Sequence, residues 1–124
     1  MIVLDASVLI SHLIEDVHST RALDIIDTEE ELAIHPITLA ECLVGPVRVS
    51  REAEAIRTIE ALGIERLRIS TEQPLALAKL RASTSLKLPD CCVLAAAIET
   101  GATLATFDAT LAKAASEHGV TVAQ

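Results

Sequence analysis

Four acidic residues stand where a predicted strand ends or a predicted helix begins: Asp5, Glu41, Asp90 and Asp108. Asp5 directly follows the apolar run 1–4, and Asp108 follows the apolar segment 102–106. Asp90 and Glu41 each lie in the first turn of a predicted helix. In an open parallel sheet, the carboxyl ends of the strands and the starts of the packed helices meet at one edge. We therefore expect the four carboxylates to converge at that edge.

Carboxylates gathered in this way favour a divalent cation. Several of them confined together cannot all stay ionised unless a cation neutralises their charge. Carboxylate oxygens without a Cys or His ligand set favour Mg²⁺ or Mn²⁺. Such an ion can activate a water and can stabilise the charge that builds on a phosphodiester during in-line attack. The hydroxyls of Ser7 and Thr106 lie near enough in sequence to orient a carboxylate or that water. The alternative for these two residues is helix capping and strand propensity.

Each acid also has a structural interpretation that the sequence leaves open. Asp5 and Asp108 can be N-caps of the helices that follow them. Glu41 completes a capping-box pattern with Thr38. Asp90, just after a proline suited to the first helical position, can simply complement the helix dipole. Taken singly, each acid is better explained by a structural role in capping or helix-dipole complementation. Only the common placement of the four acids at one sheet edge favours a catalytic role.

Apolar periodicity and the placement of Gly and Pro predict strands and helices in the order β-α-α-β-α-α-β-α-α-β-α-β. This order is typical of an α/β fold with a parallel sheet covered by helices on both faces. We expect one domain covering residues 1–124. The expected strands are 1–4, 32–35, 66–69 (at an edge), 102–106 and 120–122. The expected helices are 8–15, 20–27, one from Thr38 stopped by Gly45–Pro46, 50–62, one capped by Ser70 or Thr71 and running to 85, 89–100 ended by Gly101, and 109–118.

The composition agrees with such a fold. Hydrophobic residues make up 51% of the chain but aromatic residues only 1%, so the core consists of Ala, Leu, Ile and Val. This core suits helices layered on a parallel sheet. Phe107 is the only Phe, Trp or Tyr, which disfavours binding of single strands on an aromatic platform. No apolar run approaches the length of a membrane span and no signal peptide is visible, so we expect a cytoplasmic protein.

The three cysteines, Cys42, Cys91 and Cys92, are predicted to be free thiols in a reducing compartment. We expect them to act as small apolar core residues. A structural zinc is disfavoured because the sequence has no CxxC or HxxxH spacing.

Four segments of the chain resemble the PIN-domain ribonucleases, and within them the VapC-like toxins of toxin–antitoxin pairs. The segments are 3–10 (VLDASVLI), 36–41 (PITLAE), 88–90 (LPD) and 101–108 (GATLATFD). They occur in the family's order and span nearly the whole chain.

The resemblance implies an α/β/α sandwich, a Mg²⁺- or Mn²⁺-dependent endoribonuclease, a homodimer and a cognate antitoxin that inhibits it. Carried over position by position, it implies that Asp5, Glu41, Asp90 and Asp108 form the catalytic acidic site. Asp5 and Asp90 would be the principal metal ligands, and Glu41 and Asp108 would support a metal or its water.

The chain departs from the family pattern after the last motif. Many relatives carry a further acid and an aromatic there, where this chain has Ala109, Thr110 and Leu111. The alternative function is therefore a catalytically weak or inactive PIN domain that acts as an RNA- or antitoxin-binding module. A small-molecule α/β enzyme is disfavoured because no glycine-rich phosphate loop is present.

The net charge of −8 counts against a polyanionic substrate. Leaving out the four site acids changes it to −4, and divalent cations would offset more. The candidate phosphate contacts are Arg48, Arg51, Lys79, Arg81 and Lys87, with a solvated helix face as the alternative for each.

Overall fold

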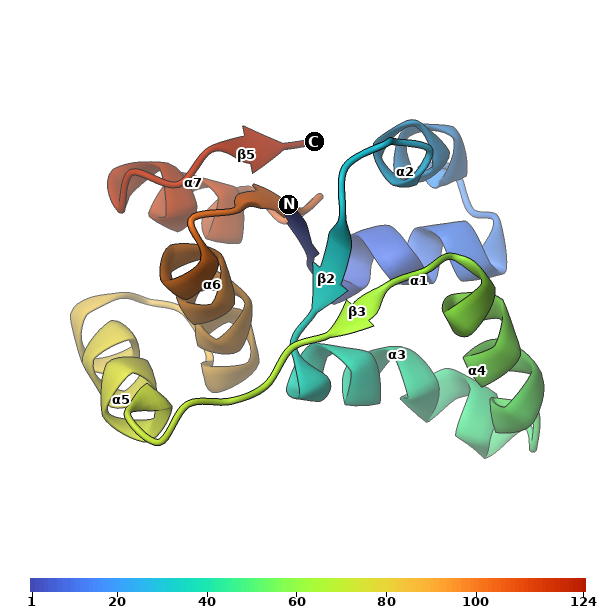
Figure 1. Cartoon of the computed structure of the whole chain (residues 1–124), viewed down its shortest axis with the longest axis horizontal. Helices are drawn as coiled ribbons and strands as arrows, with labels where there is room; N and C mark the ends of the chain where they lie inside the picture. Colours follow the sequence, from blue (N-terminus) through green and yellow to red (C-terminus); the bar gives the residue numbers. More distant parts are fainter.

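Five short parallel strands form a single sheet in the order β3-β2-β1-β4-β5 (Figure 1). The structure is a computed structural model that describes residues 1–124. The strands are β1 (Ile2–Leu4), β2 (Leu32–Ile34), β3 (Glu65–Arg66), β4 (Thr103–Ala105) and β5 (Val122–Ala123). The chain adds β2 and β3 on one side of β1 and then β4 and β5 on the other. The topological switch point, where α/β sheets bind their ligands, therefore lies between β1 and β4.

Seven helices connect the strands in the expected order, which confirms the α/β/α sandwich. They are α1 (Ala6–Ile14), α2 (Ser19–Ile26), α3 (Pro36–Arg48), α4 (Glu52–Ala61), α5 (Gln73–Ser83), α6 (Leu88–Thr100) and α7 (Ala109–Glu117). In Figure 1, α5, α6 and α7 lie to one side of the sheet and α1 to α4 to the other. None of the seven combines the length and apolar character that crossing a bilayer requires.

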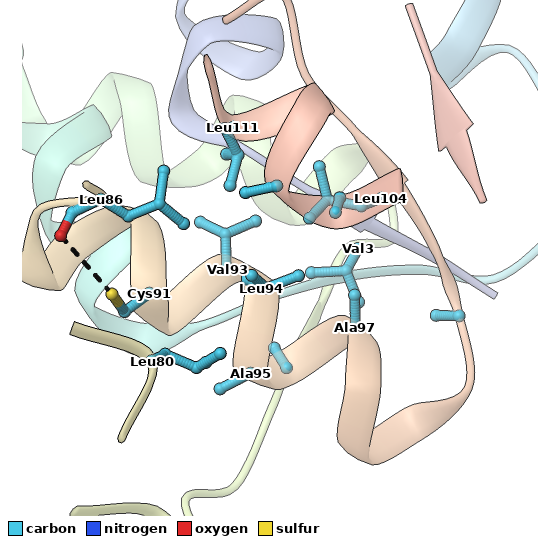
Figure 2. Close-up of a cluster of buried hydrophobic side chains, with 14 of the residues drawn as sticks. Val3, Leu80, Leu86, Cys91, Val93, Leu94, Ala95, Ala97, Leu104 and Leu111 are labelled. Atoms are coloured by element: carbon cyan, nitrogen blue, oxygen red, sulfur yellow. Dashed lines mark hydrogen bonds between the residues drawn. The ribbon is translucent and has the colours of Figure 1, made fainter. Parts of the chain in front are cut away.

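The two faces of the sheet have separate cores because side chains alternate along each strand. Val3 and Leu104 point to one face and pack against α6, as Figure 2 shows. Ile2 and Leu4 point to the other face, where they pack against α1 and α2. This alternation also decides the direction of the residues that follow each strand.

Helix α6 is the centre of the larger core. Every residue from Cys91 to Ala97 is buried, because α6 lies between the sheet, α5 and α7 (Figure 2). A helix that is apolar all round is expected to be buried in this way. Gly101 ends it in the left-handed conformation (φ 67°), as predicted. Cys42, Cys91 and Cys92 are free and buried, which confirms their predicted place in the core.

The predicted limits of α3 are wrong at both ends. The helix begins at Pro36, with His35 as its N-cap, and the Nδ1 atom of His35 accepts a hydrogen bond of 3.0 Å from the N–H of Ile37. Thr38 is therefore inside the helix, and the capping box with Glu41 does not form. Pro46 does not stop the helix, which runs on to Arg48. Packing of α3 against α1, α4 and α6 outweighs the one backbone hydrogen bond that a proline forfeits.

Other boundaries shift by a few residues. The N-cap of α5 is Glu72 rather than Ser70 or Thr71, and β3 is Glu65–Arg66 rather than 66–69. The edge position predicted for β3 is confirmed. The last strand is Val122–Ala123 rather than 120–122, since its register follows β4.

Candidate functional site

The four predicted acids lie around the carboxyl edge of the sheet. Asp5 directly follows β1 and Asp108 directly precedes α7. Asp90 is in the first turn of α6, and Glu41 lies on α3, which contacts α6. The charge of Asp5 acts on both Glu41 and Asp90, and the charge of Asp108 acts on Asp90. The fold therefore brings the four carboxylates into one electrostatic neighbourhood.

Asp5 is buried, and two hydroxyls hold one of its oxygens. Ser7 Oγ donates to Asp5 Oδ2 at 2.7 Å, and Thr106 Oγ1 donates to the same atom at 2.8 Å. Asp5 occupies the N-cap position of α1, but its side chain makes no capping hydrogen bond. The structural alternative for Asp5 is thus not realised. Its Oδ1 atom accepts no hydrogen bond from the chain and is the oxygen available to a ligand.

The same hydroxyls tie the end of β4 to the end of β1. Thr106 Oγ1 accepts from the N–H of Asp108 at 3.0 Å, and Ser7 Oγ accepts from the N–H of Phe107 at 3.0 Å. Thr106 is fully buried. Each hydroxyl therefore accepts from the backbone while donating to Asp5, which fixes the carboxylate at the switch point.

Asp108 does act as a helix cap. Its Oδ1 atom accepts a hydrogen bond of 3.0 Å from the N–H of Leu111, so the structural alternative is realised for this residue. The cap uses only Oδ1. The Oδ2 atom of this exposed side chain is left without a hydrogen bond from the chain. Capping and participation in the site are therefore compatible.

The two remaining acids resist ionisation. Partial burial is the main cause that raises the pKa of Asp90, and the charges of Asp5 and Asp108 raise it further, while Lys87 lowers it. Loss of hydration raises the pKa of Glu41, with further contributions from Asp5 and Asp90. Much of the Glu41 side chain is exposed, which keeps the hydration effect modest. Unneutralised negative charge is thus concentrated at this edge.

The residues fit a hard divalent cation by their chemistry. All four candidate ligands are carboxylates, the donors that Mg²⁺ and Mn²⁺ prefer. A buried hydroxyl without a hydrogen-bond partner, Thr38 Oγ1, lies on α3 one turn before Glu41. The side chains as placed bring no three His, Cys, Asp or Glu residues into a group able to ligate one ion.

Of the five predicted phosphate-binding bases, the structure brings Lys87 to the acids. It precedes α6, and its charge acts on Asp90. Arg51 instead pairs with Glu54 at 2.8 Å and lines a hollow of about 510 Å³ between the ends of α1, α3 and α4. That hollow is lined by none of the four acids. Arg81 acts electrostatically on Cys91. Arg48 and Lys79 are exposed on α3 and α5.

Sequence reasoning missed one further cation, Arg21, which contacts Phe107, the residue before Asp108. The guanidinium of Arg21 lies 4.4 Å from the centre of the Phe107 ring. The two residues are far apart in the chain, so no spacing rule links them.

Residues 2–117 match the model of the PIN domain, and the chain therefore belongs to the PIN-domain family. This confirms the resemblance seen in the sequence. No functionally curated protein matches the chain in sequence.

Solved structures with the same fold include toxins of toxin–antitoxin systems. A toxin–antitoxin complex from Klebsiella pneumoniae is 27% identical, with 90% of each chain covered and a TM-score of 0.74. VapBC2 of Rickettsia felis, bound to a promoter DNA fragment, is 17% identical, with 98% of this chain and 97% of that chain covered and a TM-score of 0.74. VapC20 of Mycobacterium tuberculosis, a toxin that cleaves the sarcin–ricin loop, is 12% identical, with 92% and 95% covered and a TM-score of 0.75.

Proposed function

We propose that this protein is a Mg²⁺- or Mn²⁺-dependent endoribonuclease and the toxin of a toxin–antitoxin pair. The observation that carries the proposal is the position of Asp5 at the switch point of a PIN-domain sheet, held by two hydroxyls and electrostatically coupled to Glu41 and Asp90. VapC20, the toxin of this fold that cleaves the sarcin–ricin loop, supports the choice of RNA as the substrate.

In this proposal Asp5 and Asp90 hold the cation, and Glu41 and Asp108 support it. When bound, the cation supplies charge neutralisation at the phosphodiester and activation of the attacking water. Ser7 and Thr106 hold Asp5 Oδ2, which leaves Oδ1 as the oxygen for the cation. Burial and the neighbouring carboxylates raise the pKa of Glu41 and of Asp90, so the two side chains bind protons more readily without a cation than with one. Cation binding is therefore expected to release protons.

The partner that we propose is a small antitoxin protein. The similar complex from Klebsiella pneumoniae supports this choice. The hollow between α1, α3 and α4 is the proposed place for an antitoxin segment, because exposed apolar residues such as Ile14 and Val49 line it. We also propose that the protein is cytoplasmic and forms a homodimer. Sedimentation of the purified protein would test the homodimer.

A second candidate function is an RNA- or antitoxin-binding module with little catalytic activity. The observation that favours it is the first turn of α7, which contains no acid beyond the Asp108 cap. A site with only these four carboxylates has fewer ligands for a second ion, and two-ion sites clamp both reacting oxygens.

Cleavage of a pool of cellular RNAs by the purified protein tests the proposal. The reactions contain Mg²⁺ or Mn²⁺, with an EDTA reaction and the variant Asp90→Asn beside them. Asp27→Asn is the matched control, because Asp27 is exposed beyond the end of α2, at the opposite edge of the sheet.

Discrete cuts that vanish with EDTA and in Asp90→Asn, but persist in Asp27→Asn, would support the nuclease. If no RNA is cut, and calorimetry shows that Mn²⁺ binds the wild type no better than Asp90→Asn, the catalytic proposal fails. RNA binding without cleavage would favour the binding module.

A further inference from the structure

Beside the acids, a cation lies over an aromatic ring and has no anionic partner. Arg21 on α2 is exposed, and its guanidinium lies 4.4 Å from the centre of the Phe107 ring. The ring of His18 lies 5.5 Å from the same ring, at an angle of 40°. The only two ion pairs of the molecule, Met1 with Glu30 and Arg51 with Glu54, do not involve Arg21. Its N–H donors are therefore uncommitted.

This cluster of His18, Arg21 and Phe107 is joined directly to the acid site. Phe107 stands between Thr106 and Asp108, and its N–H donates to the Ser7 hydroxyl that holds Asp5. Side chains alternate along β4, so Phe107 points to the face covered by α2 while Thr106 points to Asp5. The cluster thus lies next to the acids at the same edge, on the other side of the strand ends.

The chemistry of the cluster suits a phosphate. A guanidinium binds a phosphate with two parallel hydrogen bonds and keeps its charge at any physiological pH. The Phe107 ring restricts the arginine, which lowers the entropy lost on binding. A chain with a net charge of −8 also needs local positive charge wherever a polyanion approaches its carboxylates.

We propose that His18, Arg21 and Phe107 bind a phosphodiester of single-stranded RNA adjacent to the bond that is cut, with Arg21 as the phosphate ligand. The inference rests on the proposed function for the identity of the polymer. Phe107 positions Arg21 rather than stacking on a base, because the cation already covers a ring face. His18 adds a second donor at the rim of the cluster.

Salt dependence of RNA binding tests the proposal without requiring cleavage. The probe is a short fluorescein-labelled single-stranded RNA of random sequence, followed by anisotropy in EDTA over a range of salt concentrations. Each phosphate contact contributes about 0.7 to the slope of log K against log salt for single strands. The variants are Arg21→Gln, Arg21→Lys and Phe107→Leu. Arg57→Gln is the matched control, since Arg57 is exposed on α4 and forms no ion pair.

We expect Arg21→Gln to reduce the slope by about 0.7 and Arg57→Gln to leave it unchanged. Arg21→Lys should keep the slope but bind more weakly, because an ammonium lacks the two-point geometry. Phe107→Leu should weaken binding about two- to fivefold, the value of an exposed cation–π contact. Unchanged thermal unfolding of Arg21→Gln would show that the exposed residue acts on binding and not on the fold.

The inference is overturned if Arg21→Gln and Arg57→Gln give the same slope, whether both match the wild type or both fall equally. The first result would make the cluster a packing contact, and the second would reflect net charge alone. A wild type that binds no RNA in EDTA overturns this inference, whereas the proposed function is judged separately by the cleavage reactions in Mg²⁺ or Mn²⁺. An Arg21-dependent slope in a protein that cuts no RNA would overturn the proposed function only.

Discussion

Replacement of Thr106 by valine isolates the hydroxyl that holds Asp5. Valine keeps the shape of the side chain but removes a 2.8 Å donation to the buried carboxylate and a 3.0 Å acceptance from the N–H of Asp108. A hydrogen bond to a charged group contributes about 1.5–3 kcal/mol, and a neutral one about 1 kcal/mol. Ser7 still donates to Asp5 Oδ2, which places the loss in the lower part of the combined range. We expect the free energy of unfolding to fall by about 2.5–3 kcal/mol.

The matched control is Thr106→Ser, which keeps the hydroxyl and removes one methyl group from a fully buried position. Its expected cost is about 1 kcal/mol, from the apolar surface lost. The chain has no Trp or Tyr, so urea denaturation is best followed by far-ultraviolet circular dichroism, in EDTA and at neutral pH. A Thr106→Val variant as stable as Thr106→Ser would refute the reasoning. It would mean that the two hydrogen bonds of the hydroxyl contribute no more to stability than the single methyl group does.

Three further predictions concern stability. Asp90→Asn should raise the free energy of unfolding in EDTA at neutral pH, because burial and the charges of Asp5 and Asp108 raise the pKa of Asp90 in the fold. The charge of Asp90 begins to destabilise the fold as pH rises from the ordinary pKa of 3.8 to the raised pKa in the folded protein. An Asp90→Asn variant that is still more stable than the wild type below pH 3.8 would contradict the reasoning. Gly45→Ala should stabilise by about 0.5–1 kcal/mol in thermal unfolding, because Gly45 is inside α3 with free space at the Cβ position, and a lower melting temperature would count against this. Gln73→Leu should destabilise by about 1–3 kcal/mol in urea, because it removes the 2.8 Å partner of the buried His35 Nε2, and an unchanged midpoint would show that water replaces the amide.

The sequence was sufficient to predict the order of elements and the fold class. The signals are local: short apolar runs, helical periodicity, and Gly and Pro at the ends of elements. The alternation of strands and helices that they predict allows few topologies. The left-handed end of α6 at Gly101 is such a signal, and the structure agrees. The position of Asp5, Asp90 and Asp108 at one sheet edge also followed, because a parallel sheet places strand ends and helix starts there. Glu41 was predicted in the first turn of its helix, but it lies in the second turn of α3.

Local signals failed where tertiary packing outweighs them. The pattern of Thr38 with Glu41 indicates a helix start and Pro46 indicates a helix end. Helix α3 nevertheless begins before Thr38 and continues past Pro46. Helix propensity amounts to a few kcal/mol at most, and packing against three other helices exceeds it. The strand order, and with it the switch point between β1 and β4, is likewise a property of the assembled sheet.

The environment of the candidate site was decided almost entirely by tertiary structure. Asp5, Ser7 and Thr106 were predicted from the sequence as site residues. Only the pairing of β1 with β4 puts the Thr106 hydroxyl 2.8 Å from the Asp5 carboxylate. Arg21 meets Phe107 only because α2 packs on the face to which Phe107 points. Residues close in the chain interact through short-range backbone geometry that a sequence displays, whereas these contacts join residues far apart and exist only after the core has packed.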